Sequence, residues 1–266
     1  MIEIKNSIMK FKPNLKLITL ELYLRNLKII FQEINETDSS PINIKFLSNF
    51  NNVMHYLNTR NINTKKTYMT AIVVALQSYN NDDMLNRYYP IYLKLIEQLK
   101  NQAQSQEKTD KEKINWTSLK NLKSVLEIYK KQLTSSGVFN LDNNFITSAD
   151  FKLLQKYIVG MLYIGSPNNP PLRLDYSPMR VISKNQYNDI PTDDQTINYL
   201  VITGKNKKEF ILNDYKTKET YGKKKIPVSS IVNKALNVWL HYNTSDFLLL
   251  NNKKQQLSTN GLTKLI

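Results

Sequence analysis

NNPPLRLDYSPMRV, residues 168–181, separates a helical sequence pattern from a β-strand pattern and contains two of the chain's five arginines. The other basic residues, out of 37 in total, are lysines. A guanidinium donates paired hydrogen bonds to a phosphate or carboxylate, which an ammonium cannot do. Arg173 follows two prolines that stiffen the turn, and Asp175 lies two residues further on. The stretch therefore predicts either an oxyanion clamp around Arg173 or an Arg–Asp pair that only fastens a loop.

The half of the chain before this stretch is dominated by helical patterns. Residues 15–31 place leucines and a phenylalanine at three- and four-residue steps, which is typical of one apolar helix face. Similar spacing continues to residue 103, so four helices are predicted over residues 14–103, with Pro90 kinking or restarting the fourth. Residues 101–115 carry many charges and few apolar side chains, which predicts a linker that cannot bury enough surface to pack.

Helical spacing resumes after the linker, over residues 116–133 and 149–165, with Ser148 as the expected cap of the second helix. Beyond Pro178 the period changes, and turn residues separate four β-rich segments, MRVIS, NYLVITG, KEFILNDY and KKIPVS. These segments predict a small antiparallel sheet. A helix over residues 229–242 and the start of another in STNGLTKLI are expected to follow.

The expected fold class is α+β, mainly α with a small antiparallel β-sheet of three strands. Residues 1–104 are expected to form a helical domain, residues 105–115 a linker, and residues 116–266 a second domain that contains the sheet. A chain of 266 residues with 41% hydrophobic residues can fill a core in each domain.

The charge of the chain indicates a polyanionic partner. Its formal net charge is +15 and its isoelectric point is near 9.6, which favours DNA or RNA as the partner. A second interpretation is that the lysines form a solvated surface and reflect an A/T-rich coding genome. The protein could then be a helical scaffold, with its lysines spread evenly over both faces.

Several classes of function are disfavoured by composition. There are no cysteines, and the two histidines lie far apart in the sequence, so neither a disulfide nor a metal site is expected. No P-loop or Gly-x-Gly-x-x-Gly motif is found, and no cofactor is expected. No membrane-length apolar run or signal peptide is present, which predicts a soluble intracellular protein without a membrane partner.

The order of these segments, together with three motifs, resembles the tyrosine recombinase (phage integrase) family. The motifs are KEKINW at residues 111–116, PPLRLDYSPM at 170–179 and LNDYKTKETYGKKKIPVS at 212–229. TLELY (residues 19–23) and TKKTY (64–68) are similar to helix starts in the family's core-binding domain. The resemblance covers essentially the entire chain and is greatest to integrases of giant viruses, virophages and Polinton-like elements.

The resemblance implies a role for each candidate site residue. Arg173 matches the first catalytic arginine, which binds the phosphate to be cleaved. Lys216 matches the lysine that protonates the departing 5′-oxygen, with Lys218 in the same turn as the alternative. Asp175 resembles the family's acidic residue, although the spacing here is two residues instead of three, and Arg180 is a supporting candidate.

The implied partner is double-stranded DNA, which the two domains would grip from opposite faces during recombination or integration. Full-length members act as tetramers on DNA, whereas this chain is expected to be monomeric in free solution. Its implied location is the host cell or virion of a DNA virus or mobile element. Further basic residues are candidate DNA contacts: Arg60, Lys65, Lys66, Lys205, Lys207 and Lys208.

The sequence departs from the family at its C-terminal end. Members continue with a second catalytic arginine and a tyrosine that forms a covalent 3′-phosphotyrosine. Here no arginine follows Arg180 and no tyrosine follows Tyr242, and His241 and Tyr242 are interpreted as residues of a helix face. The chain is therefore expected to be a truncated or inactive recombinase. The alternative is a non-enzymatic basic module that binds nucleic acid or a viral protein partner.

Overall fold

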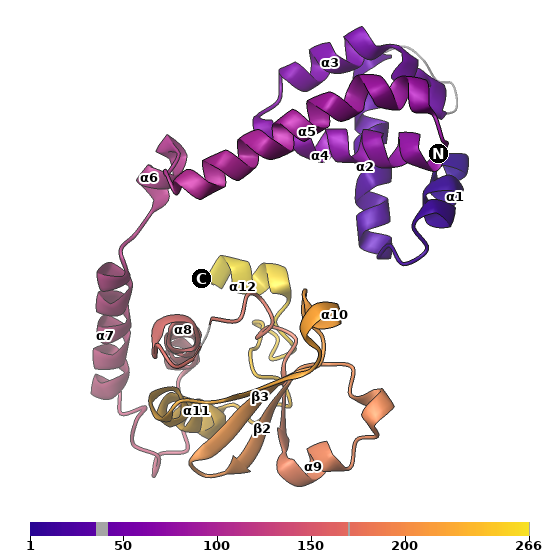
Figure 1. Ribbon diagram of the computed structural model, residues 1–266. Helices are drawn as coiled ribbons and strands as arrows, with labels where there is room; N and C mark the ends of the chain where they lie inside the picture. The colour runs from indigo at the N-terminus through magenta and orange to yellow at the C-terminus, as the bar shows by residue number, and fades with distance from the viewer. Residues whose placement is uncertain (36–41, 170, 266) are drawn as a thin grey trace. The chain divides into compact units, whose positions relative to one another are not determined.

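A computed structural model describes residues 1–35, 42–169 and 171–265 of the chain (Figure 1). It divides into two compact units, Met1–Ile114 and Asn115–Ile266, so the division falls within the segment predicted as a linker. The described residues are mainly helical with one small mixed sheet, which confirms the α+β class.

The first unit is a bundle of helices packed around α4 (Ile62–Ser78). Every residue from Ala71 to Leu76 is buried, because α4 lies against several neighbouring helices instead of exposing a polar face. The Asn61 side chain caps α4 by accepting a hydrogen bond from the Thr64 backbone N–H. The surrounding elements are α1 (Ile2–Phe11), α2 (Leu17–Ile34), η1 (Ile44–Ser48), α3 (Phe50–Asn58) and α5 (Asp82–Ser105).

Two details of the first unit differ from the sequence prediction. Helix α1 was not predicted, because it buries only Ile4 and Ile8 and so has a short apolar pattern. Helix α5 continues through Pro90 and does not restart there. Pro90 is exposed, so the backbone carbonyl that loses its hydrogen-bond donor lies on the solvent side of the helix, where water can reach it.

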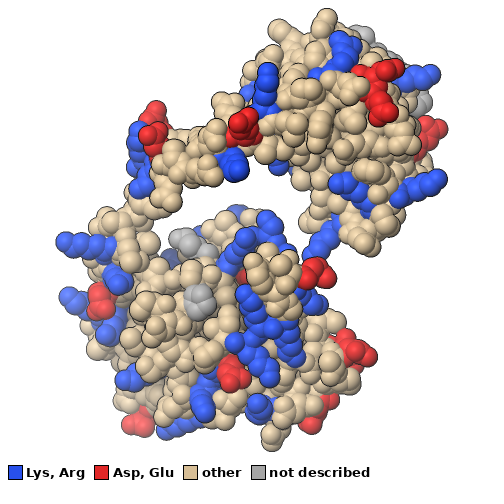
Figure 2. Space-filling model, in the orientation of Figure 1, with Lys and Arg blue, Asp and Glu red and all other residues tan. Residues whose placement is uncertain are grey.

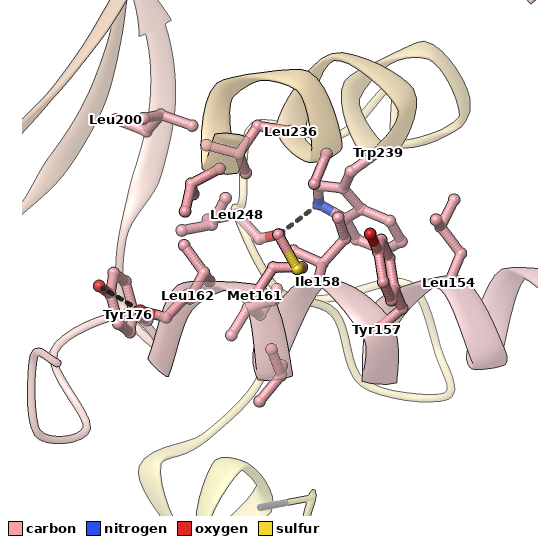
Figure 3. Close-up of a cluster of buried hydrophobic side chains, with 14 of the residues drawn as sticks. Leu154, Tyr157, Ile158, Met161, Leu162, Tyr176, Leu200, Leu236, Trp239 and Leu248 are labelled. Atoms are coloured by element: carbon pink, nitrogen blue, oxygen red, sulfur yellow. Dashed lines mark hydrogen bonds between the residues drawn. The ribbon is translucent and has the colours of Figure 1, made fainter. Parts of the chain in front are cut away.

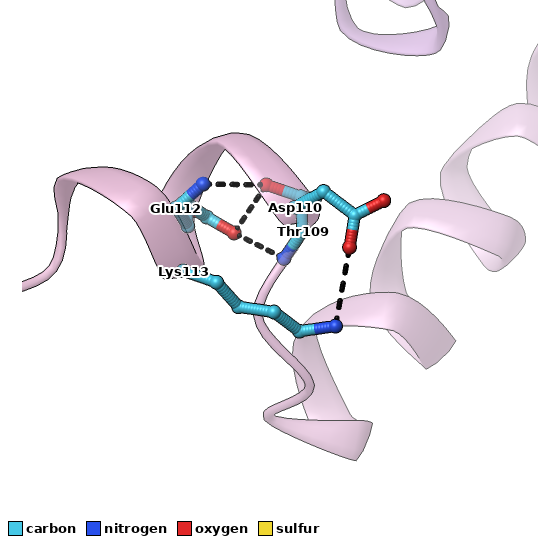
Figure 4. Close-up of polar contacts among 4 residues, drawn as sticks. All are labelled: Thr109, Asp110, Glu112 and Lys113. Atoms are coloured by element: carbon cyan, nitrogen blue, oxygen red, sulfur yellow. Dashed lines mark hydrogen bonds and ion pairs between the residues drawn. The ribbon is translucent and has the colours of Figure 1, made fainter.

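The predicted linker contains a short helix, α6 (Asp110–Asn115), held by local polar contacts (Figure 4). The Thr109 backbone N–H and hydroxyl each donate to Glu112 Oε2 at 2.8 Å, which lowers the pKa of the Glu112 carboxyl. Lys113 Nζ lies 3.2 Å from Asp110 Oδ1. These side chains are exposed, so capping and not burial forms this helix.

The second unit combines a four-stranded sheet with helices (Figure 1). The strands are β1 (Arg180–Ser183), β2 (Tyr199–Gly204), β3 (Lys207–Leu212) and β4 (Lys224–Pro227), in that spatial order. The longer helices are α7 (Leu119–Ser135), α8 (Ser148–Ile164), α11 (Ser230–Tyr242) and α12 (Thr259–Leu265). Three short helices lie in the connections: α9 (Lys184–Asn188), η2 (Thr192–Asp194) and α10 (Lys218–Tyr221).

The prediction of a three-stranded antiparallel sheet was wrong in two respects. The sheet has four strands, and β1 pairs with β2 in parallel, whereas β2–β3 and β3–β4 are antiparallel. A parallel pair needs a long crossover, and residues 184–198, with α9 and η2, supply it. Thr147, and not Ser148, caps α8, since its side chain accepts from the Asp150 backbone N–H at 3.0 Å.

The core of the second unit lies between one face of the sheet and helices α8 and α11 (Figure 3). Trp239 is fully buried there, and its indole Nε1 donates to the Leu248 carbonyl at 2.7 Å. Gly160 on α8 leaves room for Leu126 of α7, because a Cβ at residue 160 would collide with the Leu126 side chain. A smaller cluster around Tyr199, Val201 and Ile211 covers the opposite sheet face.

Candidate nucleic-acid interface

The strand directions bring several predicted site residues to one end of the sheet. Strands β1 and β2 are parallel and begin at this end, β3 ends there, and β4 begins there. The turn that carries Arg173 and Asp175 precedes β1, and the segment of residues 213–223 connects β3 to β4. Both segments therefore emerge at the same end, which is called the basic sheet end below.

Arg173 lies in an irregular turn anchored by buried neighbours. Leu172 and Tyr176 on either side are buried, and the Tyr163 hydroxyl of α8 donates to the Arg173 backbone carbonyl. The Arg173 side chain itself is exposed, and within the described part of the chain its guanidinium forms no ion pair or hydrogen bond. The turn therefore fixes the backbone of Arg173 and leaves its charged group available. Pro170, the first of the two prolines, lies outside the described residues.

Asp175 connects this turn electrostatically with the segment after β3. Burial raises the pKa of the Asp175 carboxyl, the nearby Arg173 charge opposes that rise, and the Asp214 carboxylate adds to it. Asp214 therefore lies close to Asp175. Arg173 and Asp175 influence each other electrostatically but form no ion pair. The turn is therefore not fastened by an Arg–Asp salt bridge, which was the alternative predicted from the sequence.

The segment after β3 is braced where it leaves the sheet. Asn198, just before β2, accepts hydrogen bonds at 2.9 Å from the backbone N–H groups of Asn213 and Asp214, and donates to the Asp214 carbonyl at 2.7 Å. Lys216 and Lys218 follow as exposed side chains. The brace fixes the start of this turn next to β2, and the Asp214 charge within it acts on Asp175 of the Arg173 turn.

Three lysines at the start of β4 were not singled out from the sequence. Lys223, Lys224 and Lys225 are exposed, and β4 is an edge strand at the basic sheet end. Figure 2 shows a dense band of basic side chains over this part of the second unit. The signal available in the sequence was the run GKKKIP, in which three consecutive lysines lead into a predicted β-segment.

The other predicted lysines lie at the opposite end of the sheet. Lys205 and Lys207 are exposed in the β2–β3 turn, about 20 Å from the basic sheet end at the usual rise of six strand residues. Lys208 was predicted to contact DNA, but it is only 4% exposed, so this prediction was wrong. Its ammonium donates to the side-chain oxygens of Asn233 and Asn237 on α11, and burial lowers its pKa.

Strand alternation explains why Lys208 is buried. Residues two apart on a strand share a face, so Lys208 points to the same side as Phe210 and Leu212, which belong to the core. Arg180 lies on β1, where its guanidinium is 5.2 Å from the centre of the Phe247 ring. Arg180 is exposed at the sheet edge opposite β4. It therefore lies at the basic sheet end but away from Lys224.

In the first unit, the three predicted DNA contacts lie around the start of α4. Arg60 already has partners, since its guanidinium is 3.8 Å from Glu33 and 4.4 Å from the centre of the Tyr56 ring. Lys65 Nζ donates to Asn58 Oδ1 at 2.6 Å, and Lys66 is half-buried. Arg60 and Lys65 are therefore already engaged by neighbouring side chains, unlike the Arg173 guanidinium.

No family model, curated protein or solved structure matches the chain. Tyr242, which could in principle supply a nucleophile, has its hydroxyl hydrogen-bonded to the carbonyls of Val138 and Asn143. His241 contacts the Asn143 carbonyl at 3.2 Å, so both are helix-face residues with structural partners. Within the described ranges, no group of three or more acidic or histidine side chains is placed to hold a metal, and no helix could cross a membrane.

Removing the Tyr163 hydroxyl is expected to make the second unit less sensitive to alkaline pH. Burial raises the pKa of Tyr163 to about 12, against 10.0 ordinarily. The stability that comes from keeping the Tyr163 hydroxyl protonated in the folded state is therefore complete below pH 10 and is lost as pH rises toward 12. We expect Tyr163→Phe to lose less stability than the wild type across that window. Denaturant unfolding followed by tryptophan fluorescence measures this, because both tryptophans lie in the second unit.

The exposed Tyr221 provides the matched control, since Tyr221→Phe removes a hydroxyl from the same unit without disturbing the Arg173 turn. An alkaline loss of stability in Tyr163→Phe as steep as in the wild type would show that the Tyr163 hydroxyl does not couple to folding.

Proposed function

We propose that this chain binds duplex DNA through the basic sheet end and holds one backbone phosphate between Arg173 and the turn of Lys216 and Lys218. The observation that carries the proposal is the exposed Arg173 guanidinium, without a partner among the described residues, beside a turn braced to display lysines. A guanidinium suits this position because it can span two phosphate oxygens, whereas the lysines add charge without a fixed geometry.

We further propose that the chemistry of this site is that of a tyrosine recombinase that acts in DNA recombination or integration. A tyrosine hydroxyl other than that of Tyr242 would attack phosphorus and form the 3′-phosphotyrosine bond as the bond to the 5′-oxygen breaks. Arg173 would stabilise the charge that builds up on phosphorus, and Lys216 or Lys218 would protonate the departing 5′-oxygen. Asp175 is close enough to influence Arg173 and would orient it. Tyr242 does not supply the nucleophile in this proposal, because its hydroxyl is held between two backbone carbonyls.

Duplex binding by the full chain is expected to depend steeply on salt. If Arg173, Lys216, Lys218 and Lys224 each neutralise a phosphate, a plot of log affinity against log salt should have a slope of about −3 to −4. Fluorescence anisotropy with a labelled duplex at several salt concentrations measures this slope. Absence of binding at low salt, or an affinity that does not change with salt, contradicts the proposal.

The second candidate function is nucleic-acid binding without catalysis, and the occupied Tyr242 hydroxyl favours it. A nicked duplex that traps a covalent protein–DNA adduct tests whether a tyrosine of this chain attacks phosphorus. An adduct that survives denaturing electrophoresis supports an active recombinase and contradicts the non-enzymatic module, whereas salt-dependent binding without any adduct supports binding without catalysis.

A further inference from the structure

Tyr221 is an exposed aromatic residue at the basic sheet end with no role in the phosphate site described above. It closes α10 in the connection between β3 and β4, and its side chain is 63% exposed. Five lysines lie within the same connection and the start of β4: Lys216, Lys218, Lys223, Lys224 and Lys225. The Tyr221 ring is therefore exposed to water among cations, where a ligand that carries both a flat ring and a phosphate can reach it.

The connection is built to hold this ring in place. Tyr215 is half-buried against the core of the second unit, and its hydroxyl donates to the Gly222 carbonyl at 2.6 Å. Gly222 adopts a positive φ of 64°, which reverses the chain directly after Tyr221 at low cost because glycine has no Cβ. Tyr215 therefore anchors the segment from which Tyr221 projects.

Lys224 completes the arrangement. Its ammonium lies 4.7 Å from the centre of the Tyr221 ring and 5.7 Å from the centre of the Tyr215 ring, so it contacts both aromatic side chains. This contact limits the positions of Lys224 and of the exposed ring together. The result is an aromatic ring with a cation held over one face, so that a base would stack on the other face.

We propose that Tyr221 is a stacking platform for an unpaired nucleic-acid base whose neighbouring phosphate is held by Lys224. The inference rests on the proposed function, because it takes the basic sheet end as a nucleic-acid surface. Aromatic rings alternating with cations are how proteins bind single strands, since every base has a face to stack and every nucleotide has a phosphate. Bases inside a duplex are already stacked on each other, so Tyr221 selects a base that is unpaired or displaced from the helix.

The test measures binding of the full chain to four labelled probes: an oligothymidylate, an abasic deoxyribose-phosphate oligomer of equal length, an oligouridylate and a duplex. Tyr221→Ala is expected to weaken oligothymidylate binding by about 5- to 100-fold and to leave abasic binding unchanged. Tyr221→Phe keeps the ring and should bind as the wild type does. Phe145→Ala, which removes another exposed aromatic residue of the same unit, is the matched control.

The outcomes separate this inference from the proposed function. Equal wild-type affinity for the thymidylate and abasic probes, or a Tyr221→Phe loss as large as that of Tyr221→Ala, overturns the stacking platform while duplex binding can stand. Failure to bind any probe at low salt overturns the proposed function itself. A base-dependent affinity seen only with oligouridylate supports the platform and assigns it to RNA. A Tyr221→Trp variant, whose fluorescence a stacked base should quench, checks the contact directly.

Discussion

Replacing Arg173 with alanine is expected to weaken duplex binding by about 10- to 100-fold at low salt. The estimate follows from hydrogen bonds to a charged group, which contribute about 1.5–3 kcal/mol each. The slope of log affinity against log salt should also become less steep by about one phosphate contact. The substitution should affect binding and not stability, because the Arg173 guanidinium makes no hydrogen bond or ion pair with any described residue. Anisotropy titrations over a salt series measure both quantities.

Two variants show whether geometry or charge causes the loss. Arg173→Lys keeps the charge but loses the two-pronged contact, so its affinity should fall between those of the wild type and Arg173→Ala. Lys131→Ala removes an exposed charge from α7 in the same unit and should change affinity only slightly. If Lys131→Ala weakens binding as much as Arg173→Ala, the chain binds DNA through its overall charge and Arg173 makes no specific phosphate contact.

Replacing Trp239 with alanine is expected to lower the free energy of unfolding of the second unit by about 3–5 kcal/mol. Trp239 is 0% exposed, its ring centre lies 4.9 Å from that of Phe151, and its indole N–H donates to the Leu248 carbonyl (Figure 3). The substitution leaves a cavity between α8, α11 and the chain after α11, and takes away a buried hydrogen-bond donor. Denaturant unfolding followed by the fluorescence of Trp116, which remains in the same unit, measures the loss.

Neighbouring substitutions on α11 set the scale of this effect. Trp239→Phe keeps most of the ring volume and should cost less than alanine, while still losing the donor to Leu248. Ile231→Ala, at an exposed position of the same helix, should change stability little. An unfolding free energy in Trp239→Ala equal to that of Ile231→Ala would mean that Trp239 does not hold this core together.

Much of the helical structure was predictable from local patterns. The apolar spacing located α2, α4, α7, α8 and α11, because a helix that packs on a core must repeat its apolar residues every three or four positions. The turn around Arg173 was also recognisable, since a rare arginine beside prolines and an acid stands out in a lysine-rich chain. Helix α1 escaped prediction because its buried face consists of only two isoleucines.

The residue types and their order determine that the chain is mainly helical, that it has a small sheet, and that its charge is strongly positive. Only the tertiary structure decided which cations are available. Parallel pairing of β1 with β2 brings the Arg173 turn to the end of the sheet where Lys216 and Lys224 lie, and strand alternation places Lys208 beneath α11. The parallel pairing depends on contacts between residues far apart in the sequence, which a local pattern does not give. The alternation of Lys208 with Phe210 and Leu212 is local, but that this face of β3 lies against α11 is decided only by the tertiary structure.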